Sequence, residues 1–552
     1  MALVCVPIMV TDAQSALEAA RHAKTAGADM VEFRVDGWFT GRQGDDTQAV
    51  HGNTIEDVVA LVSASPAPCI LTCRTVLEGG QYDGPEAERL LMLQRAGMAA
   101  GNGTRSPSFI DFELDRYAPN PDAHRALGAV VKRPERDGDA DTRMILSFHD
   151  FNARPADLLR KCETMVAERA CAVVKIAYRM RSVRDNLEML DLVAECPKPM
   201  IGLGMGTFGL MSRVLAGKFG GFLTFAALER EQATAPGQPT VAELLNNYRF
   251  RSISSATKVY GVIGWPVEHS LSPAVHNAGF EAAGHDGVYL PLPVAPEFEA
   301  LKATLLEFID HPRLAFGGCS VTLPHKEHLV RLARQMMQDG DERWTLDPLS
   351  AKCGAANTVI VTRDSMGEAV RIDVVNTDAP AAAALLDGVP NRSAAIIGSG
   401  GTTRALAAAL ATSGWKVKIV SRVLSRATKL VDELALPNIT PADHVSLADE
   451  EIGAVVNCTP VGMAHGPDPL GSPVEAGVLR NLPPDGVVAD VVYNPLRTPL
   501  LKEAEAQGRT TISGLAMFLG QAAAQFRLWT GHPAPEQLFE RVARETLASR
   551  ST

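Results

Sequence analysis

Short apolar runs rich in β-branched residues recur along the first 230 residues and alternate with amphipathic stretches. The runs lie at 3–8, 30–35, 69–74, 109–114, 144–149, 172–177, 200–204 and 221–226. Strands that are apolar throughout and separated by helices are typical of a parallel sheet that is covered on both faces. Eight such strands in so short a stretch favour a closed (β/α)8 barrel, although a doubly wound open sheet would show a similar periodicity.

A polar, basic stretch at 246–258 separates this region from a second alternation of strand-like and helix-like segments. At 394–401 an apolar strand leads into the turn GSGG and then into a helix. Such a unit presents backbone N–H groups to a pyrophosphate. Because Thr403 occupies the third glycine position of the usual fingerprint, the pattern fits a tight structural turn equally well. The next strand ends at Ser421 and Arg422, and these residues with Arg426 favour the 2′-phosphate of NADP over the ribose hydroxyls of NAD.

Composition narrows the functional class. The 552 residues exceed a single compact module, and 53 basic against 64 acidic residues give a net charge of −11. This acidic balance argues against a nucleic-acid or membrane partner. The nine cysteines show no metal-ligand spacing. With neither a basic leader nor an apolar run of about 18 residues, the sequence predicts a cytoplasmic protein with small-molecule partners and no metal.

Polar residues lie at the carboxyl ends of the predicted strands in the first half, where a barrel places its active site. A lysine inside the run VVKIA is costly to bury unless it is used or paired, although its amine could also reach the rim as a structural group. A lysine can form a Schiff base with a ketone, a nearby histidine can move protons, and arginines can hold a carboxylate. Together they predict imine-assisted β-elimination from a hydroxylated keto acid. The residues are Glu32, Arg34, Arg74, Asp111, Glu113, His149, Lys175, Arg213 and Gln238.

The motifs EFRVD, TCRTVLEGG, SFHDF, VKIA, SRV and APGQ occur in this order, and over residues 1–245 the chain resembles the type I 3-dehydroquinate dehydratase family. The resemblance implies a TIM barrel in which Lys175 forms the imine, His149 is the general acid/base and Glu78 orients the histidine. It also implies substrate-binding residues, one of which, Thr234, stands where the family usually has serine. These are Glu32, Arg34, Arg74, Arg213, Thr234 and Gln238.

The motifs HSLSP, VTLPHK, AANT, NTD, GSGGTTRA, NCTPVGM, DVVYNPLRTPL and GLAMFLGQ resemble the shikimate dehydrogenase family over residues 257–545. The resemblance implies an α/β substrate domain at 257–385, an NADP-binding Rossmann domain at 386–515 and a C-terminal helical segment at 516–552 that returns to the substrate domain. It makes Lys326 and Asp378 the catalytic pair. The implied substrate ligands are Ser270, Ser272, Thr322, Asn357, Tyr493 and Gln521, and the implied cofactor ligands are Gly398, Ser399, Gly400, Gly401, Ser421, Arg422 and Gly514. Trp265 replaces a commoner asparagine, and SRV replaces the usual NRT.

The two resemblances together predict a bifunctional enzyme of the shikimate pathway, which leads to the aromatic amino acids. Its lyase half converts 3-dehydroquinate to 3-dehydroshikimate, and its NADP-dependent oxidoreductase half reduces that product to shikimate. Two alternatives stay open. The second half could be a quinate dehydrogenase, which needs more room near Ser272, or the whole chain could be a non-catalytic regulator that binds the same metabolites.

Overall fold

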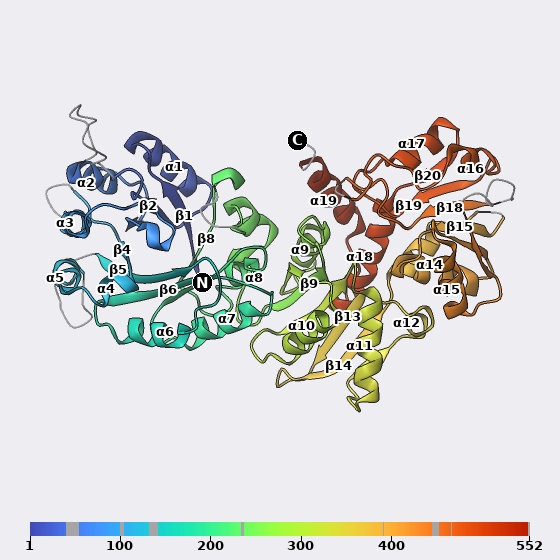
Figure 1. The fold of residues 1–552 in the computed structure, drawn as a ribbon, viewed down its shortest axis with the longest axis horizontal. Coiled ribbons are helices and arrows are strands. Elements are labelled where there is room, and N and C mark those ends of the chain that lie inside the picture. The colour runs from blue at the N-terminus through green and yellow to red at the C-terminus, as the bar shows by residue number, and fades with distance from the viewer. Residues whose placement is uncertain are drawn as a thin grey trace. The chain divides into compact units, whose positions relative to one another are not determined.

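The computed structural model describes residues 1–39, 54–99, 104–131, 142–232, 237–389, 391–443, 452–464 and 466–549. Thr234, a predicted substrate ligand, lies outside these ranges. The chain forms two compact units, Met1–Thr257 and Lys258–Thr552 (Figure 1). None of the described helices is long and apolar enough to cross a membrane.

Eight parallel strands form the sheet of the first unit, in the order β7-β6-β5-β4-β3-β2-β1-β8. Because β1 pairs with both β2 and β8, the sheet curls on itself, and the Phe222 N–H donates to the Met200 carbonyl at 2.8 Å where β8 approaches β7. The strands are β1 (Leu3–Met9), β2 (Met30–Arg34), β3 (Cys69–Thr72), β4 (Phe109–Glu113), β5 (Arg143–Asp150), β6 (Cys171–Arg179), β7 (Met200–Met205) and β8 (Leu223–Phe225).

Helices surround this barrel (Figure 1). In α1 the buried residues Ala16, Ala20 and Ala23 recur at helical spacing, and Asp12 caps the first turn by accepting from the Ser15 N–H at 2.8 Å. The helices are α1 (Ala13–Thr25), α2 (Ile55–Ser63), α3 (Glu86–Gly97), α4 (Leu114–Tyr117), α5 (Pro121–Val130), α6 (Leu158–Ala167), α7 (Asp185–Glu195) and α8 (Leu210–Val214), with the short 3₁₀ turn η1 (Val76–Glu78) after β3.

The barrel interior is layered by the two-residue period of its strands. Ile70, Phe109, Ile145 and Val173 belong to one buried apolar cluster. Two residues further along the same four strands, on the same face of the sheet, lie Thr72, Asp111, Ser147 and Lys175. A polar layer therefore follows the apolar one toward the carboxyl ends of the strands.

The second unit begins with a mixed six-stranded sheet in the order β10-β9-β11-β13-β14-β12, in which β13 is antiparallel to both neighbours. Its strands are β9 (Lys258–Gly264), β10 (Gly287–Pro293), β11 (Phe316–Val321), β12 (Trp344–Leu346), β13 (Thr358–Arg363) and β14 (Ala369–Val375). The helices of this part are α9 (Ser272–Ala282), α10 (Phe298–Asp310), α11 (Lys326–Gln338), α12 (Pro348–Cys353) and α13 (Asp378–Ala384).

The C-terminal helices α18 (Gly514–Thr530) and α19 (Glu536–Ser549) pack on α9, which belongs to the same part of the second unit as this mixed sheet. Phe526 stacks on Phe280 with ring centroids 5.8 Å apart, and Phe539 meets Phe526 edge-on at 5.6 Å. These rings belong to one buried cluster that also includes Trp529. The chain thus returns to the elements of this mixed sheet after a further sheet is complete.

A parallel sheet in the order β17-β16-β15-β18-β19-β20 lies between these segments. The central strand β15 has β16 on one side and β18 on the other, so the strand order reverses beside it, which is where open α/β sheets bind ligands. The elements are β15 (Ser393–Ile397), α14 (Gly401–Thr412), β16 (Lys416–Val420), α15 (Leu424–Leu434), β17 (Ile439–Ala442), β18 (Ala454–Asn457), α16 (Ala476–Arg480), β19 (Val487–Asp490), α17 (Pro499–Ala506) and β20 (Thr510–Ile512). The predicted fold class, a barrel followed by two α/β parts, is confirmed.

Candidate active sites

Lys175 lies inside the barrel on β6 and is 4% exposed. Its Nζ is 2.8 Å from Asp111 Oδ2 and 3.5 Å from Glu32 Oε1, and it lies 4.6 Å from the centre of the Phe225 ring. The sequence predicted arginines around this lysine. The structure brings two carboxylates from the same predicted set of strand-end residues, Asp111 and Glu32, into contact with its amine.

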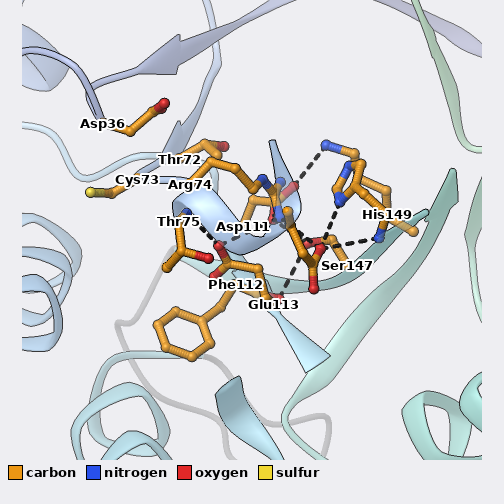
Figure 2. A network of polar contacts seen from close by, with 12 residues as sticks. Asp36, Thr72, Cys73, Arg74, Thr75, Asp111, Phe112, Glu113, Ser147 and His149 are labelled. Atoms are coloured by element: carbon orange, nitrogen blue, oxygen red, sulfur yellow. Dashed lines mark hydrogen bonds and ion pairs between the residues drawn. The ribbon is translucent and has the colours of Figure 1, made fainter. Parts of the chain in front are cut away.

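Arg74 follows β3 and bonds both Asp111 on β4 and Ser147 on β5 (Figure 2). Its Nη2 donates to Asp111 Oδ1 at 2.8 Å, and its Nη1 donates to Ser147 Oγ at 2.6 Å. The Ser147 hydroxyl donates in turn to Asp111 Oδ1 at 2.6 Å. Burial alone would raise the pKa of Asp111, but the Arg74 and Lys175 cations hold it well below its usual range. Asp111 is therefore a fixed anion beneath the lysine.

His149 and Glu78 meet at the mouth of the barrel, although 71 residues separate them. The Nδ1–H of His149 donates to Glu78 Oε2 at 2.9 Å, and the His149 backbone N–H donates to the same oxygen at 3.1 Å. Burial, with the cations of Arg74 and Lys175, lowers the pKa of His149 well below its usual value. Burial raises the pKa of Glu78 to about 8.

The three predicted arginines have different surroundings. Arg34 pairs with the buried carboxylate of Asp36 at 2.8 Å and 3.0 Å, and Arg74 pairs with Asp111. Arg213, on α8, is 2% exposed, burial lowers its pKa to about 10, and its Nε has no hydrogen-bond partner among the described residues. A buried guanidinium nitrogen that has no acceptor among the described residues can take one from a ligand, which among these three arginines favours Arg213 for a substrate carboxylate. Gln238 is also buried.

Sequence reasoning named Glu113 but missed Asp36 and the buried contacts through which these two carboxylates support the site. Asp36 accepts from the Gln81 N–H at 2.9 Å and so ties Arg34 to the loop that carries Glu78. Glu113 accepts from the Thr75 N–H at 2.8 Å and from Arg89 Nη1 at 2.5 Å. The available signal was the alternation of carboxylates with apolar residues in FIDFE, which places both side chains on one face of β4.

In the second unit, the directions of the strands bring the predicted substrate residues together along one edge of the mixed sheet, where several strands end. β9 and β11 are parallel and end at this edge, β13 begins there, and β14 ends there because it is antiparallel to β13. The chain leaves these points through the loop with Ser270 and through Thr322, Asn357 and Asp378.

Lys326 Nζ donates to Asp378 Oδ2 at 2.6 Å and to Thr402 Oγ1 at 3.0 Å. Lys326 is the first residue of α11, and Asp378 is the first residue of α13. Thr402 belongs to α14, which follows the glycine turn of the other sheet. The predicted pair is therefore in contact, and a third group that the sequence did not indicate joins it.

The other predicted substrate residues lie around the same edge. Asn357 Nδ2 donates to Thr377 Oγ1 at 2.9 Å, next to Asp378. Ser272 is buried, and its N–H donates to Ser270 Oγ at 3.2 Å. From the C-terminal side, Gln521 on α18 donates to the Phe518 carbonyl at 3.1 Å, and the ring of Phe518 lies 5.2 Å from that of Tyr493.

The turn between β15 and α14 fits a dinucleotide. Gly398 has φ of +126°, and a Cβ there would lie 3.2 Å from the Cys458 carbonyl oxygen, whereas a Cβ on Gly400 would meet open space. Ser399 and Gly400 lead into the N-terminus of the twelve-residue α14, whose first N–H groups suit a pyrophosphate. Ser421 and the exposed Arg422 follow β16, the neighbouring strand. A Cβ on Gly514 would lie 2.4 Å from the Val491 carbonyl oxygen, so this approach requires glycine.

Known protein families match segments in both halves of the chain. Residues 4–255 match type I 3-dehydroquinase, residues 262–359 match the shikimate dehydrogenase substrate binding domain, and residues 514–544 match the shikimate 5′-dehydrogenase C-terminal domain. A chloroplastic bifunctional 3-dehydroquinate dehydratase/shikimate dehydrogenase of Arabidopsis thaliana is 34% identical over 559 residues, which cover 98% of this chain and 84% of that protein. The chain belongs to this bifunctional family. Both predicted resemblances are thereby confirmed.

Other known proteins match one half of this chain or nearly all of it. A shikimate dehydrogenase (NADP(+)) of Paramagnetospirillum magneticum is 38% identical over 288 residues, which cover 50% of this chain and 95% of that protein. A solved structure of the dehydroquinate dehydratase and shikimate dehydrogenase from S. pombe AroM is 25% identical, covers 98% of each chain and has a TM-score of 0.41.

Proposed function

We propose that the residues of the barrel dehydrate 3-dehydroquinate to 3-dehydroshikimate and that the residues around Lys326 then reduce this product to shikimate with NADPH. The observation that carries the proposal is that each unit holds a complete acid–base set in contact. Lys175 pairs with Asp111, His149 pairs with Glu78, and Lys326 bonds directly to Asp378. A non-catalytic metabolite binder would not need to keep either set.

In the dehydratase reaction, Lys175 attacks the ketone of the substrate and water leaves, so that an imine joins lysine and substrate. The imine acidifies the neighbouring carbon, His149 takes a proton from that carbon, and the hydroxyl group one carbon further leaves as water after His149 returns the proton. Hydrolysis then releases the enone and restores the amine. Arg213 holds the substrate carboxylate, and Asp111 keeps Nζ aimed at the carbonyl carbon.

The pKa of Glu78 predicts the pH dependence of dehydration. An ionised Glu78 stabilises the imidazolium that forms when His149 takes a proton, and a neutral Glu78 does not. Because burial raises the pKa of Glu78 to about 8, the dehydratase kcat/KM rises about tenfold per pH unit below pH 8 and levels off above it. The measurement is the initial rate of enone formation between pH 5.5 and about 9.5.

The variant Glu78→Gln should abolish this rise and lower the plateau. Glu188→Gln is the matched control, since Glu188 pairs with Arg154 on the outside of the barrel at 2.6 Å and should leave the profile unchanged. A Glu78→Gln enzyme with the wild-type pH profile would show that another group controls the histidine.

In the dehydrogenase reaction, bound NADPH supplies the hydride that reduces the ketone. Lys326 gives a proton to the oxygen that becomes the hydroxyl group, and Asp378 holds the ammonium beside it through the 2.6 Å contact. The buried hydroxyl of Ser272 and the amide of Asn357 border the same edge and bind the other polar groups of the ring. A quinate dehydrogenase needs additional room near Ser272, and this serine is present and buried.

The exposed Arg422 and Arg426 bind the 2′-phosphate of NADP. Both residues follow β16, which lies next to the point where the strand order reverses and where such sheets hold the adenosine of a dinucleotide. A charge-assisted contact of about 1.5–3 kcal/mol predicts a preference for NADP over NAD of about 10- to 150-fold in kcat/KM. Arg422→Ser should remove most of this preference by raising the KM for NADP alone.

Arg480→Ser is the matched control for this experiment, because Arg480 is an exposed arginine on α16 of the same sheet. It should keep the wild-type preference. Equal efficiency of the unaltered enzyme with both cofactors would contradict the role of Arg422.

A reducing compartment such as the cytoplasm fits the thiols, since all nine cysteines are free and most are buried. The Arabidopsis relative is named as chloroplastic. Cytoplasmic localisation therefore stays a prediction for this chain.

A further inference from the structure

Thr402, from the part of the second unit that holds the glycine turn, contacts the proposed acid/base lysine. Lys326 Nζ donates to Thr402 Oγ1 at 3.0 Å while it also donates to Asp378 Oδ2 at 2.6 Å. The close approach depends on Gly401, because a Cβ there would lie only 3.1 Å from Lys326 Cβ. The lysine stem is thus packed against the first turn of α14.

The two acceptors come from different sheets. Asp378 begins a helix of the substrate-domain sheet, whereas Thr402 is the second residue of the helix that follows the glycine turn. An ammonium has three donors. With two of them held by fixed acceptors, the third has one remaining direction, which serves the substrate oxygen.

We propose that Thr402 is a positioning residue for Lys326: its hydroxyl aims the lysine and ties it to the helix on which the cofactor pyrophosphate is bound. The position of the lysine then depends on acceptors from both sheets of the second unit. Asp378 alone leaves Nζ free to rotate about a single contact. This inference rests on the role proposed for Lys326.

The test compares Thr402→Val, which keeps the shape and removes the hydroxyl, with Thr402→Ser, which keeps the hydroxyl. Since a hydrogen bond to a charged group is lost, Thr402→Val should lower kcat for shikimate oxidation by about 10- to 150-fold, with the KM for shikimate changed by less than about twofold. Thr402→Ser should restore kcat to within about twofold of wild type. Thr412→Val, at the far end of α14, is the matched control and should keep kcat, since its hydroxyl only bonds the Ala408 carbonyl.

Binding of NADPH without substrate, followed by its fluorescence, gives a readout that is independent of turnover. A positioning role predicts an unchanged dissociation constant for Thr402→Val. A wild-type kcat in Thr402→Val, a Thr402→Ser enzyme as slow as Thr402→Val, or a loss of NADPH affinity equal to the loss of kcat would each overturn the inference. Failure of the proposed function is distinguishable, because then Lys326→Ala would also keep its kcat.

Discussion

Replacing Lys175 by alanine lowers the rate of 3-dehydroquinate dehydration by at least about 10³-fold and leaves shikimate oxidation by the same chain unchanged. The loss is large because the variant can form no imine, so the carbon next to the ketone is no longer acidified. The dehydrogenase is unaffected because Lys175 belongs to the compact unit Met1–Thr257, and the second acid–base pair lies in the other unit.

Borohydride reduction in the presence of 3-dehydroquinate tests directly whether Lys175 forms the imine. The unaltered chain should gain one substrate-derived mass on the peptide that contains Lys175, and Lys175→Ala should gain none. Lys198→Ala is the matched control, since Lys198 bonds the Glu168 and Cys171 carbonyls at the opposite end of β6. Lys175→Met, which fills the buried space without an amine, guards against a folding defect. A labelled peptide elsewhere, or near-normal dehydration by Lys175→Met, would refute the imine at this position.

Replacing Lys326 by alanine lowers kcat for shikimate oxidation by about 10²–10⁴-fold while shikimate still binds. The physical reason is that the hydroxyl proton then has no acceptor held beside it. The alternative is a structural ion pair, in which case the variant loses stability but the folded fraction keeps its kcat. Because Asp378 is buried and would be left without its cation, Lys326→Met serves as a second, better-packed variant.

A double-mutant comparison separates the two cases. Asp378→Asn should also lower kcat, and the double variant Lys326→Met with Asp378→Asn should be no slower than Lys326→Met alone, since the pair acts as a unit. Lys258→Ala, at the exposed start of β9, is the control and should keep kcat. Additive losses, or a folded Lys326→Met with the wild-type kcat, would remove the lysine from the mechanism.

The barrel was predictable because parallel strands that are covered on both faces are apolar at nearly every position of the sequence. The run 144–149 corresponds to β5 and the run 172–177 to β6. Strand ends were less predictable, since they depend on the neighbouring strand. β6 continues to Arg179 because Tyr178 and Arg179 pair with β7, whereas β3 stops at Thr72, before Arg74 turns into its loop.

The candidate sites were predictable where a residue carries its own motif, as Lys326 and Asp378 do, and the structure places this pair 2.6 Å apart. Contacts that depend on tertiary register were not predictable. Asp111 was visible as a strand-end carboxylate, but its place under Lys175 depends on three adjacent strands. Nor could spacing distinguish Arg34 and Arg74, which have carboxylate partners, from Arg213, whose Nε has no partner among the described residues.

The most direct test of two active sites in one chain is a single reaction that starts from 3-dehydroquinate and NADPH, with enone absorbance and NADPH absorbance recorded together. The unaltered chain should consume NADPH after a transient of enone. Lys326→Met should accumulate enone and consume NADPH about 10²–10⁴-fold more slowly than the unaltered chain. Lys175→Met should form enone and consume NADPH at least about 10³-fold more slowly until 3-dehydroshikimate is added, when NADPH consumption starts at the normal rate. NADPH consumption from 3-dehydroquinate at the wild-type rate by Lys175→Met, or by Lys326→Met, would contradict two separate active sites.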